Sequence, residues 1–273
     1  MFVKPMLLEK AQKPFNDDSY ITELKMDGIR LLLSKFNDKI KLYTRHNNEV
    51  THKFKELHHL DIPNGTILDG EIIVPGDHGK PDFESMMSRF MSSTTNHTIQ
   101  FVIFDIIYYN GSKVKLPLLE RKQLLESIIT ESQYIVLSKW ILGNAVEYFD
   151  FVESNGLEGI VQKKANSRYE INRRSSSWLK VINYNYANGI FITGIRKNEF
   201  GVKLILDNGE YKGIMEFMPK EERKKLFLMA QNHIINETDS FIYLEPIIKV
   251  NIKYRNMTSS NKYRIPSFNG WSE

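Results

Sequence analysis

Apolar and polar residues alternate along several short segments of the first 165 residues. In residues 39–44, Ile40 and Leu42 alternate with polar neighbours, and the turn pair Asn37-Asp38 comes just before them. A two-residue period is typical of a strand with one buried face, and close turns between strands favour antiparallel pairing. We therefore predict an antiparallel, hairpin-rich sheet with strands over residues 20–24, 30–35, 39–44, 65–74, 99–108 and 159–163.

Other segments of the same region have the spacing of helices. The clearest lies over residues 118–130, where an amphipathic pattern begins directly after Pro117, a residue that favours helix starts. The segment over residues 145–155 is followed by Gly156, and glycine is typical of helix ends. The predicted helices cover residues 53–60, 83–91, 118–130 and 145–155.

After residue 180 the pattern changes to short strands. Asp207-Asn208-Gly209 is a strong hairpin turn, and a helix over residues 222–230 follows Pro219. Five short strands with a helix after the third are the order of an OB barrel. We place the boundary in the polar run 183–188, which gives domains over residues 1–183 and 184–273. The predicted strands are 190–196, 202–206, 210–215, 241–244 and 248–254.

The composition narrows the chemistry that this chain can perform. The 273 residues include no cysteine, which excludes disulfides, zinc ribbons and thiol nucleophiles. A net charge of +4 is compatible with nucleic acid as a partner. The longest apolar run, residues 101–109, is interrupted by Asp105 and is too short to span a bilayer. We expect a cytoplasmic protein that does not enter the membrane.

The first concentration of candidate chemistry is residues 23–30, Glu-Leu-Lys-Met-Asp-Gly-Ile-Arg, at the end of a predicted strand. Covalent capture of a nucleotide requires an amine near a tight turn and near an acid that can hold a metal. Lys25 would be that amine, and Gly28 is expected to turn with positive φ. The alternative is a hairpin turn with solvated charges, because Asp-Gly commonly marks turns.

Five further motifs follow in a fixed order, and the acids in them lie at the edges of predicted strands. The set resembles the covalent nucleotidyltransferase superfamily, and within it the ATP-dependent DNA ligases of the small bacterial and bacteriophage type. The resemblance implies an α+β fold, with an antiparallel-sheet, ATP-grasp-like nucleotidyltransferase domain before the OB barrel. The motifs lie at residues 44–47, 68–72, 102–106, 158–163 and 177–181.

The resemblance implies how ATP would be held. Lys25 would become adenylated, with Glu23 at the adenine edge and Phe104 stacked on the base. Such stacking contributes about 1–3 kcal/mol. Glu71 would contact the ribose, and Lys180 would neutralise the α-phosphate.

The resemblance also implies a divalent cation and a DNA partner. Asp27, Glu71 and Glu158 would hold Mg²⁺ or Mn²⁺, hard ions that prefer oxygen ligands. Asp27 and Arg30 would shape the phosphate end and the nick. Arg45, also assigned to the nucleotide site, would grip the 5′-phosphate of a nick. The partner would be nicked duplex DNA, bound by a monomer; no protein partner is implied.

Two departures of the chain from the family concern the cations that bind phosphate. Members usually carry a second lysine two positions after Lys180, where this chain has Ile182. Either phosphate is held more weakly or Lys163 or Lys164 supplies the missing cation. Near the C-terminus, Ser272 stands where an arginine for pyrophosphate is expected. The cations that could replace that arginine are Arg255, Lys262 and Arg264.

Taken one at a time, these residues have simpler explanations. Phe104 alone would be a core residue of an apolar strand, and Asp69-Gly70 alone would be a turn. The acids and cations alone would be solvated surface charges, and we assign no metal to the histidines. Only their joint occurrence, in order, favours the ligase.

Other functions fit these motifs less well. An RNA ligase or an mRNA-capping guanylyltransferase would use the same chemistry, but Arg264-Ile265-Pro266-Ser267-Phe268 after the barrel resembles DNA ligases. NAD-dependent ligases carry zinc-binding cysteines that this chain lacks. A non-catalytic OB-fold binder with decayed ligase motifs would not need an intact set of Lys25, Asp27, Glu71 and Glu158. The expected reaction joins a 3′-hydroxyl to a 5′-phosphate, as DNA replication, repair and recombination require.

Overall fold

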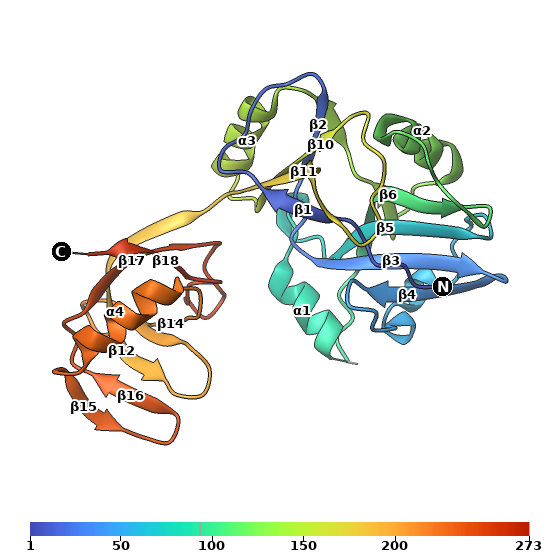
Figure 1. Ribbon diagram of the computed structural model, residues 1–273. Helices are drawn as coiled ribbons and strands as arrows, with labels where there is room; N and C mark the ends of the chain where they lie inside the picture. The colour runs from blue at the N-terminus through green and yellow to red at the C-terminus, as the bar shows by residue number, and fades with distance from the viewer. Residues whose placement is uncertain (93, 273) are drawn as a thin grey trace. The chain divides into compact units, whose positions relative to one another are not determined.

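The structure, a computed structural model, describes residues 1–92 and 94–272, without the side chain of His78. The fold is α+β, as predicted, and its elements are shown in Figure 1. The chain divides into two compact units, Met1–Ile182 and Asn183–Glu273. Within the described ranges, no helix is both long enough and apolar enough to cross a lipid bilayer.

A six-stranded sheet forms one part of the first unit. Its strands follow the order β4-β3-β5-β6-β7, and β8 runs parallel to β6. Asn37 and Asp38, with φ of 51° and 58°, make the two-residue turn between β3 and β4. The strands are β3 (Ile29–Phe36), β4 (Lys39–Thr44), β5 (Thr66–Ile73), β6 (Gln100–Tyr109), β7 (Ser112–Lys113) and β8 (Ile135–Leu137).

A five-stranded sheet forms the other part, in the order β1-β11-β10-β2-β9. Its pairs are antiparallel except β1 with β11, which is parallel. The central pairing of β2 with β10 places Leu24 opposite Ile160, so that the end of β2 lies beside the start of β10. The strands are β1 (Leu7–Lys10), β2 (Tyr20–Leu24), β9 (Trp140–Leu142), β10 (Gly159–Lys164) and β11 (Arg174–Ile182).

Three of the four helices predicted in this unit are confirmed: α1 (Phe83–Met91), α2 (Leu118–Ile128) and α3 (Ala145–Ser154). The helix predicted over residues 53–60 is wrong. Two 3₁₀ turns, Thr51–Lys53 and Lys55–Leu57, stand there, separated by Phe54 with φ −128° and ψ 71°. Phe54 and Leu57 are both fully buried, and their spacing of three suits a tight turn better than an α-helix.

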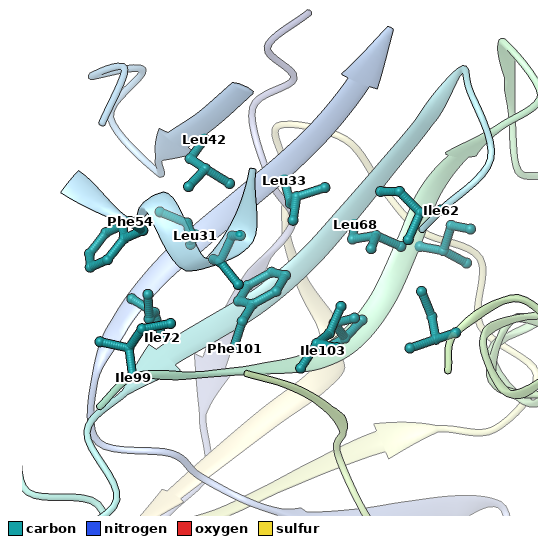
Figure 2. Packing of buried hydrophobic residues seen from close by; sticks show 14 of the residues in the cluster. Leu31, Leu33, Leu42, Phe54, Ile62, Leu68, Ile72, Ile99, Phe101 and Ile103 are labelled. Carbon is teal, nitrogen blue, oxygen red and sulfur yellow. The ribbon is translucent and has the colours of Figure 1, made fainter. Parts of the chain in front are cut away.

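The largest apolar cluster lies against one face of the six-stranded sheet. Alternate residues of β3, Leu31 and Leu33, point into it together with side chains of β5 and β6 (Figure 2). Phe54 and Met86 reach the same cluster from the 3₁₀ turns and from α1. Burial of a large apolar side chain contributes about 1.5–3 kcal/mol, so this cluster anchors the sheet.

The second unit is one seven-stranded sheet with a single described helix, α4 (Lys220–Ala230). The predicted helix after the third strand is confirmed, but the unit has two more strands than predicted. The long first strand pairs with three neighbours, β13, β16 and β17. The strands are β12 (Asn185–Arg196), β13 (Val202–Ile205), β14 (Tyr211–Met215), β15 (Ile234–Glu237), β16 (Phe241–Leu244), β17 (Lys249–Tyr254) and β18 (Ser267–Trp271).

The closed barrel predicted for this unit is not formed by the pairing of the described residues. The outer strands β14 and β18 share no ladder, and an isolated bridge joins Phe217, beyond the end of β14, to Ser267. A barrel requires continuous pairing around its circumference. The sheet is therefore open along this edge.

One buried ion pair joins α2 to the six-stranded sheet. Arg121 donates to both carboxylate oxygens of Asp105 at 2.6 and 2.8 Å, and both side chains are fully buried. Its remaining donor group reaches the carbonyls of Leu116 and Ser167, each at 2.8 Å. Because every charge has a partner, this network tolerates burial that isolated charges would not.

We expect Asp105→Asn to destabilise the protein by about 3–5 kcal/mol, because it leaves the Arg121 guanidinium buried without a counter-charge. Urea unfolding followed by tryptophan fluorescence measures the change. Glu126→Gln, at an exposed position of the same helix, is the control and should stay within about 0.5 kcal/mol of the wild type. A loss for Asp105→Asn no larger than that of the control would contradict the assignment.

Candidate active site

A pocket in the first unit gathers residues from both of its sheets. Lys25 follows β2 directly, Phe104 lies on β6, and Lys163 and Trp178 face each other across β10 and β11. Alternate residues of a strand point to the same face, so Val161 and Lys163 of β10 both reach the pocket. The residues lining the pocket are Leu8, Glu23, Leu24, Lys25, Met26, Arg30, Glu71, Phe104, Ser138, Val161, Lys163 and Trp178.

Lys25 is held beside Glu158 at the edge of this pocket. Its ammonium nitrogen lies 2.6 Å from Glu158 Oε2, and its backbone N–H donates to the Gly159 carbonyl at 2.9 Å. The two side chains remain partly accessible, at 22% and 10%. The amine is therefore oriented by a carboxylate and can still be reached by a ligand.

Gly28 has a different role from the one predicted. Its φ does not lie in the left-handed region, so the expected positive φ is wrong. A Cβ at this position would lie 2.2 Å from the Ile72 carbonyl oxygen and 2.8 Å from the Ile73 side chain. Glycine is required here because the backbone packs directly against β5. Lys25 and Arg30, on either side of this close contact between Gly28 and β5, both line the pocket.

Arg30 is fixed by a buried carboxylate. Its Nε and Nη2 donate to the two oxygens of Asp69 at 2.9 and 2.6 Å, and the Tyr169 hydroxyl donates to Asp69 at 2.6 Å. Burial opposes the charge of Arg30, but Asp69 outweighs it and raises the pKa of Arg30. Burial and then Asp69 also raise the pKa of Tyr169. Asp69-Gly70 is thus the middle of β5, and the simpler reading of a turn is wrong.

Glu71 lines the pocket close to Lys25 and Arg30. Burial raises its pKa to about 8, and the nearby Glu158 and Asp69 add to the rise while the two cations oppose it. Glu71 and Glu158 together offer carboxylate oxygens, which suit a divalent cation. Within the described residues no group of three or more such ligands gathers, so substrate phosphates would have to complete the coordination, as is usual for Mg²⁺.

Glu23 lies buried between two lysines. Its Oε2 is 2.6 Å from Lys163 Nζ, and its Oε1 accepts from Lys122 Nζ, which also donates to the Phe104 carbonyl at 2.9 Å. Lys163 Nζ stands 4.6 Å from the ring centroid of Phe104 and 4.2 Å from that of Trp178. Burial lowers the pKa of Lys163 to about 8, and Glu23 offsets part of the loss.

Four of the predicted site residues do not line this pocket in the described part of the chain: Asp27, Arg45, Glu158 and Lys180. Glu158 reaches it through Lys25. Lys180 lies on the same strand face as Trp178, two positions further along β11. Ile182 lies on that face too and is buried. An apolar side chain therefore occupies the position where family members usually carry a second lysine.

Arg45 lies in a second pocket of the first unit. Lys4, His46 and Arg174 line that pocket with it, and the Arg45 Nε contacts His46 Nε2 at 2.9 Å. The structure thus places Arg45 in a separate cationic depression and not among the residues around Lys25. Of the two lysines considered for the missing cation, Lys163 lines the first pocket and Lys164 is exposed.

Sequence reasoning missed Lys122 and Asp69 and gave Trp178 no role. A signal for Lys122 existed in α2, whose buried residues are Leu118, Arg121, Lys122 and Leu125. Charged residues inside such an apolar stripe indicate buried ion pairs. For Asp69 the signal was its place in a nearly continuous run of buried strand residues, Thr66–Ile73.

Comparisons with known proteins agree with this geometry. The family described as "ATP dependent DNA ligase domain" matches residues 1–181. The SPbeta prophage-derived DNA ligase-like protein LigB of Bacillus subtilis (strain 168) is 51% identical over 272 residues, 99% of both chains. The DNA ligase of Thermococcus fumicolans is 26% identical over 272 residues, 88% of this chain but 48% of its own length. The chain therefore spans nearly all of one relative and about half of the other.

Solved structures share the fold over nearly the whole chain. A structure from work on Lig E DNA ligases aligns with a TM-score of 0.67 at 18% identity, covering 96% of this chain and 98% of that one. The ligase domain of M. tuberculosis LigD aligns with a TM-score of 0.60 at 23% identity, covering 98% and 94%. The match to the family model and the full-length relative at 51% identity together show that this chain belongs to the ATP-dependent DNA ligase family.

Proposed function

We propose that this protein seals nicks in duplex DNA at the expense of ATP, through an adenylate on Lys25. The observation that carries the proposal is the Lys25 amine, held 2.6 Å from Glu158 at a pocket that also contains Phe104, Glu71 and Lys163. An oriented lysine beside a carboxylate and an aromatic wall suits covalent transfer of a nucleotide. Membership of the DNA ligase family supports the same reaction.

In the first step the Lys25 nitrogen attacks the α-phosphorus of ATP. The new N–P bond forms as the bond from phosphorus to the pyrophosphate oxygen breaks, and the amine loses its proton. Glu158, already in contact with the amine, is placed to accept that proton. Phe104 would stack on adenine, Glu71 would bind the ribose, and the nearby cations would balance the phosphate charge.

In the second step AMP passes from Lys25 to the 5′-phosphate at the nick, which restores the amine. In the third step the adjacent 3′-hydroxyl attacks that activated phosphate, AMP leaves, and the phosphodiester bond is complete. A divalent cation, Mg²⁺ or Mn²⁺, would supply neutralisation of phosphate charge. Glu71 and Glu158 are the residues that fit it, and Asp27 stays a further candidate.

For the DNA, we propose that the pocket around Arg45 receives a phosphate of the nicked strand. Arg45, Lys4 and Arg174 bring three cations to one depression, and arginine binds phosphate through paired donors. The first unit would be the adenylation domain and the second an OB-fold domain that contacts the duplex. The protein would act as a cytoplasmic monomer.

Lys25→Arg should lower formation of the protein–AMP adduct by at least about 10³-fold, because a guanidinium keeps the charge but is too weak a nucleophile. Labelling with α-³²P-ATP and Mg²⁺, followed by denaturing electrophoresis, measures the adduct; sealing of nicked DNA and nicked RNA measures the overall reaction. Lys39→Arg, at the exposed first residue of β4, is the control. Wild-type labelling by the Lys25→Arg protein would refute the assignment.

Arg45→Ala should reduce the preference for a 5′-phosphate nick over a 5′-hydroxyl nick, because one cation facing the terminal phosphate is lost. Binding to the two nicks at several salt concentrations measures this, and the slope of log affinity against log salt should shrink by about one. Arg168→Ala removes an exposed arginine elsewhere and should leave the preference intact. Equal losses for both nicks would argue against a contact with the terminal phosphate.

A further inference from the structure

The Glu23 carboxylate lines the pocket and forms ion pairs with two buried lysines, Lys122 and Lys163. Its side chain is 3% exposed, and those of Lys122 and Lys163 are 5% and 2% exposed. Each lysine occupies a different oxygen of the carboxylate. Burial of three charged groups is costly unless the geometry holds them together, so this triad requires an explanation.

Both lysines are tied to their places by a second contact. Lys122 extends from α2 and donates to the backbone carbonyl of Phe104 at 2.9 Å as well as to Glu23. Lys163 extends from β10, and its ammonium lies near the faces of the Phe104 and Trp178 rings. Neither ammonium can leave without breaking contacts on two sides. The carboxylate between them is therefore held in one orientation.

A carboxylate held in this way can only accept hydrogen bonds. Its two oxygens provide about four acceptor positions. Lys122 donates to one oxygen, and Lys163 lies 2.6 Å from the other as an ion pair, so acceptor positions remain for a ligand. Glu23 lines the same pocket as the Phe104 ring, so a purine stacked on that ring would bring an edge towards it. Adenine presents an amino group that donates, whereas guanine presents a carbonyl that accepts. The Glu23 carboxylate can therefore accept a hydrogen bond from the adenine amino group, whereas it repels the guanine carbonyl.

We propose that Lys122 is a positioning residue which, together with Lys163, fixes Glu23 as the acceptor that selects adenine over guanine. The inference rests on the proposed ATP-dependent function and adds the source of its nucleotide selectivity. Lys122 does not line the pocket in the described structure and acts through Glu23. Lys163 is thereby assigned to the base-reading end of the pocket and not to the cation missing at Ile182.

The test measures protein–nucleotide adduct formation with α-³²P-ATP and α-³²P-GTP for Lys122→Met, Lys122→Arg and the exposed control Lys115→Met. Lys122→Met should raise the KM for ATP about tenfold and lower the ATP-to-GTP ratio of kcat/KM by a similar factor, the effect of losing about 1.4 kcal/mol of hydrogen bonding. Its kcat should change less than about threefold, because Lys25 is untouched. Lys122→Arg should restore the ratio.

Three results would overturn the proposal. The first is an unchanged ATP-to-GTP ratio of kcat/KM in Lys122→Met, and the second is a loss of kcat alone in that variant. The third is transfer of GMP as readily as AMP by the wild type, which would refute selection by Glu23.

Thermal unfolding shows whether Lys122→Met folds. If it does not, Lys122→Gln and Lys122→Arg supply the same comparison. Failure of the wild type to form any adduct with ATP would instead refute the nucleotidyltransferase function itself.

Discussion

The site depends on the hydrogen-bonded register of β2, β10 and β11. Pairing of Leu24 with Ile160 sets Lys25 beside Glu158, the residue just before β10. At the other end of β10, Lys163 lies opposite Trp178 of β11. A slip of one residue would turn every one of these side chains to the opposite face of the sheet. Gly159, with φ of 144°, packs where a Cβ would meet the Val181 carbonyl oxygen at 2.2 Å, so the register is also sterically fixed.

Charge is handled in the first unit by small closed groups. Arg121 with Asp105 and Arg30 with Asp69 and Tyr169 form closed hydrogen-bonded groups, and Glu23 forms ion pairs with two lysines. Such groups contribute little net stability, but the loss of one member leaves a buried charge exposed to the full cost of desolvation. Two of the three border the pocket. Ion pairs therefore help to orient the pocket walls, beside the apolar packing of residues such as Trp178.

Local pattern was enough to predict most elements, because alternating burial and turn chemistry act over a few residues. It located β2, β4 and α1 to the residue, and it placed Lys25 directly after a strand. It failed where burial depends on distant partners. The strand that contains Asp69 was predicted, but the ion pair of Asp69 with Arg30 and its contact with Tyr169 join distant segments, and the very short β7 and β8 exist only as neighbours of β6. The open edge of the second unit is likewise a property of long-range pairing.

Two adjacent residues of α2 connect the helix to two different strands. Arg121 pairs with Asp105 of β6, and Lys122 pairs with Glu23 of β2. The position of this one helix therefore affects Glu23, which lines the pocket, through the side chain of Lys122. Under the proposed role of Lys122, a redesign of base preference would change Lys122 and keep Arg121, whose ion pair with Asp105 holds the helix against the sheet.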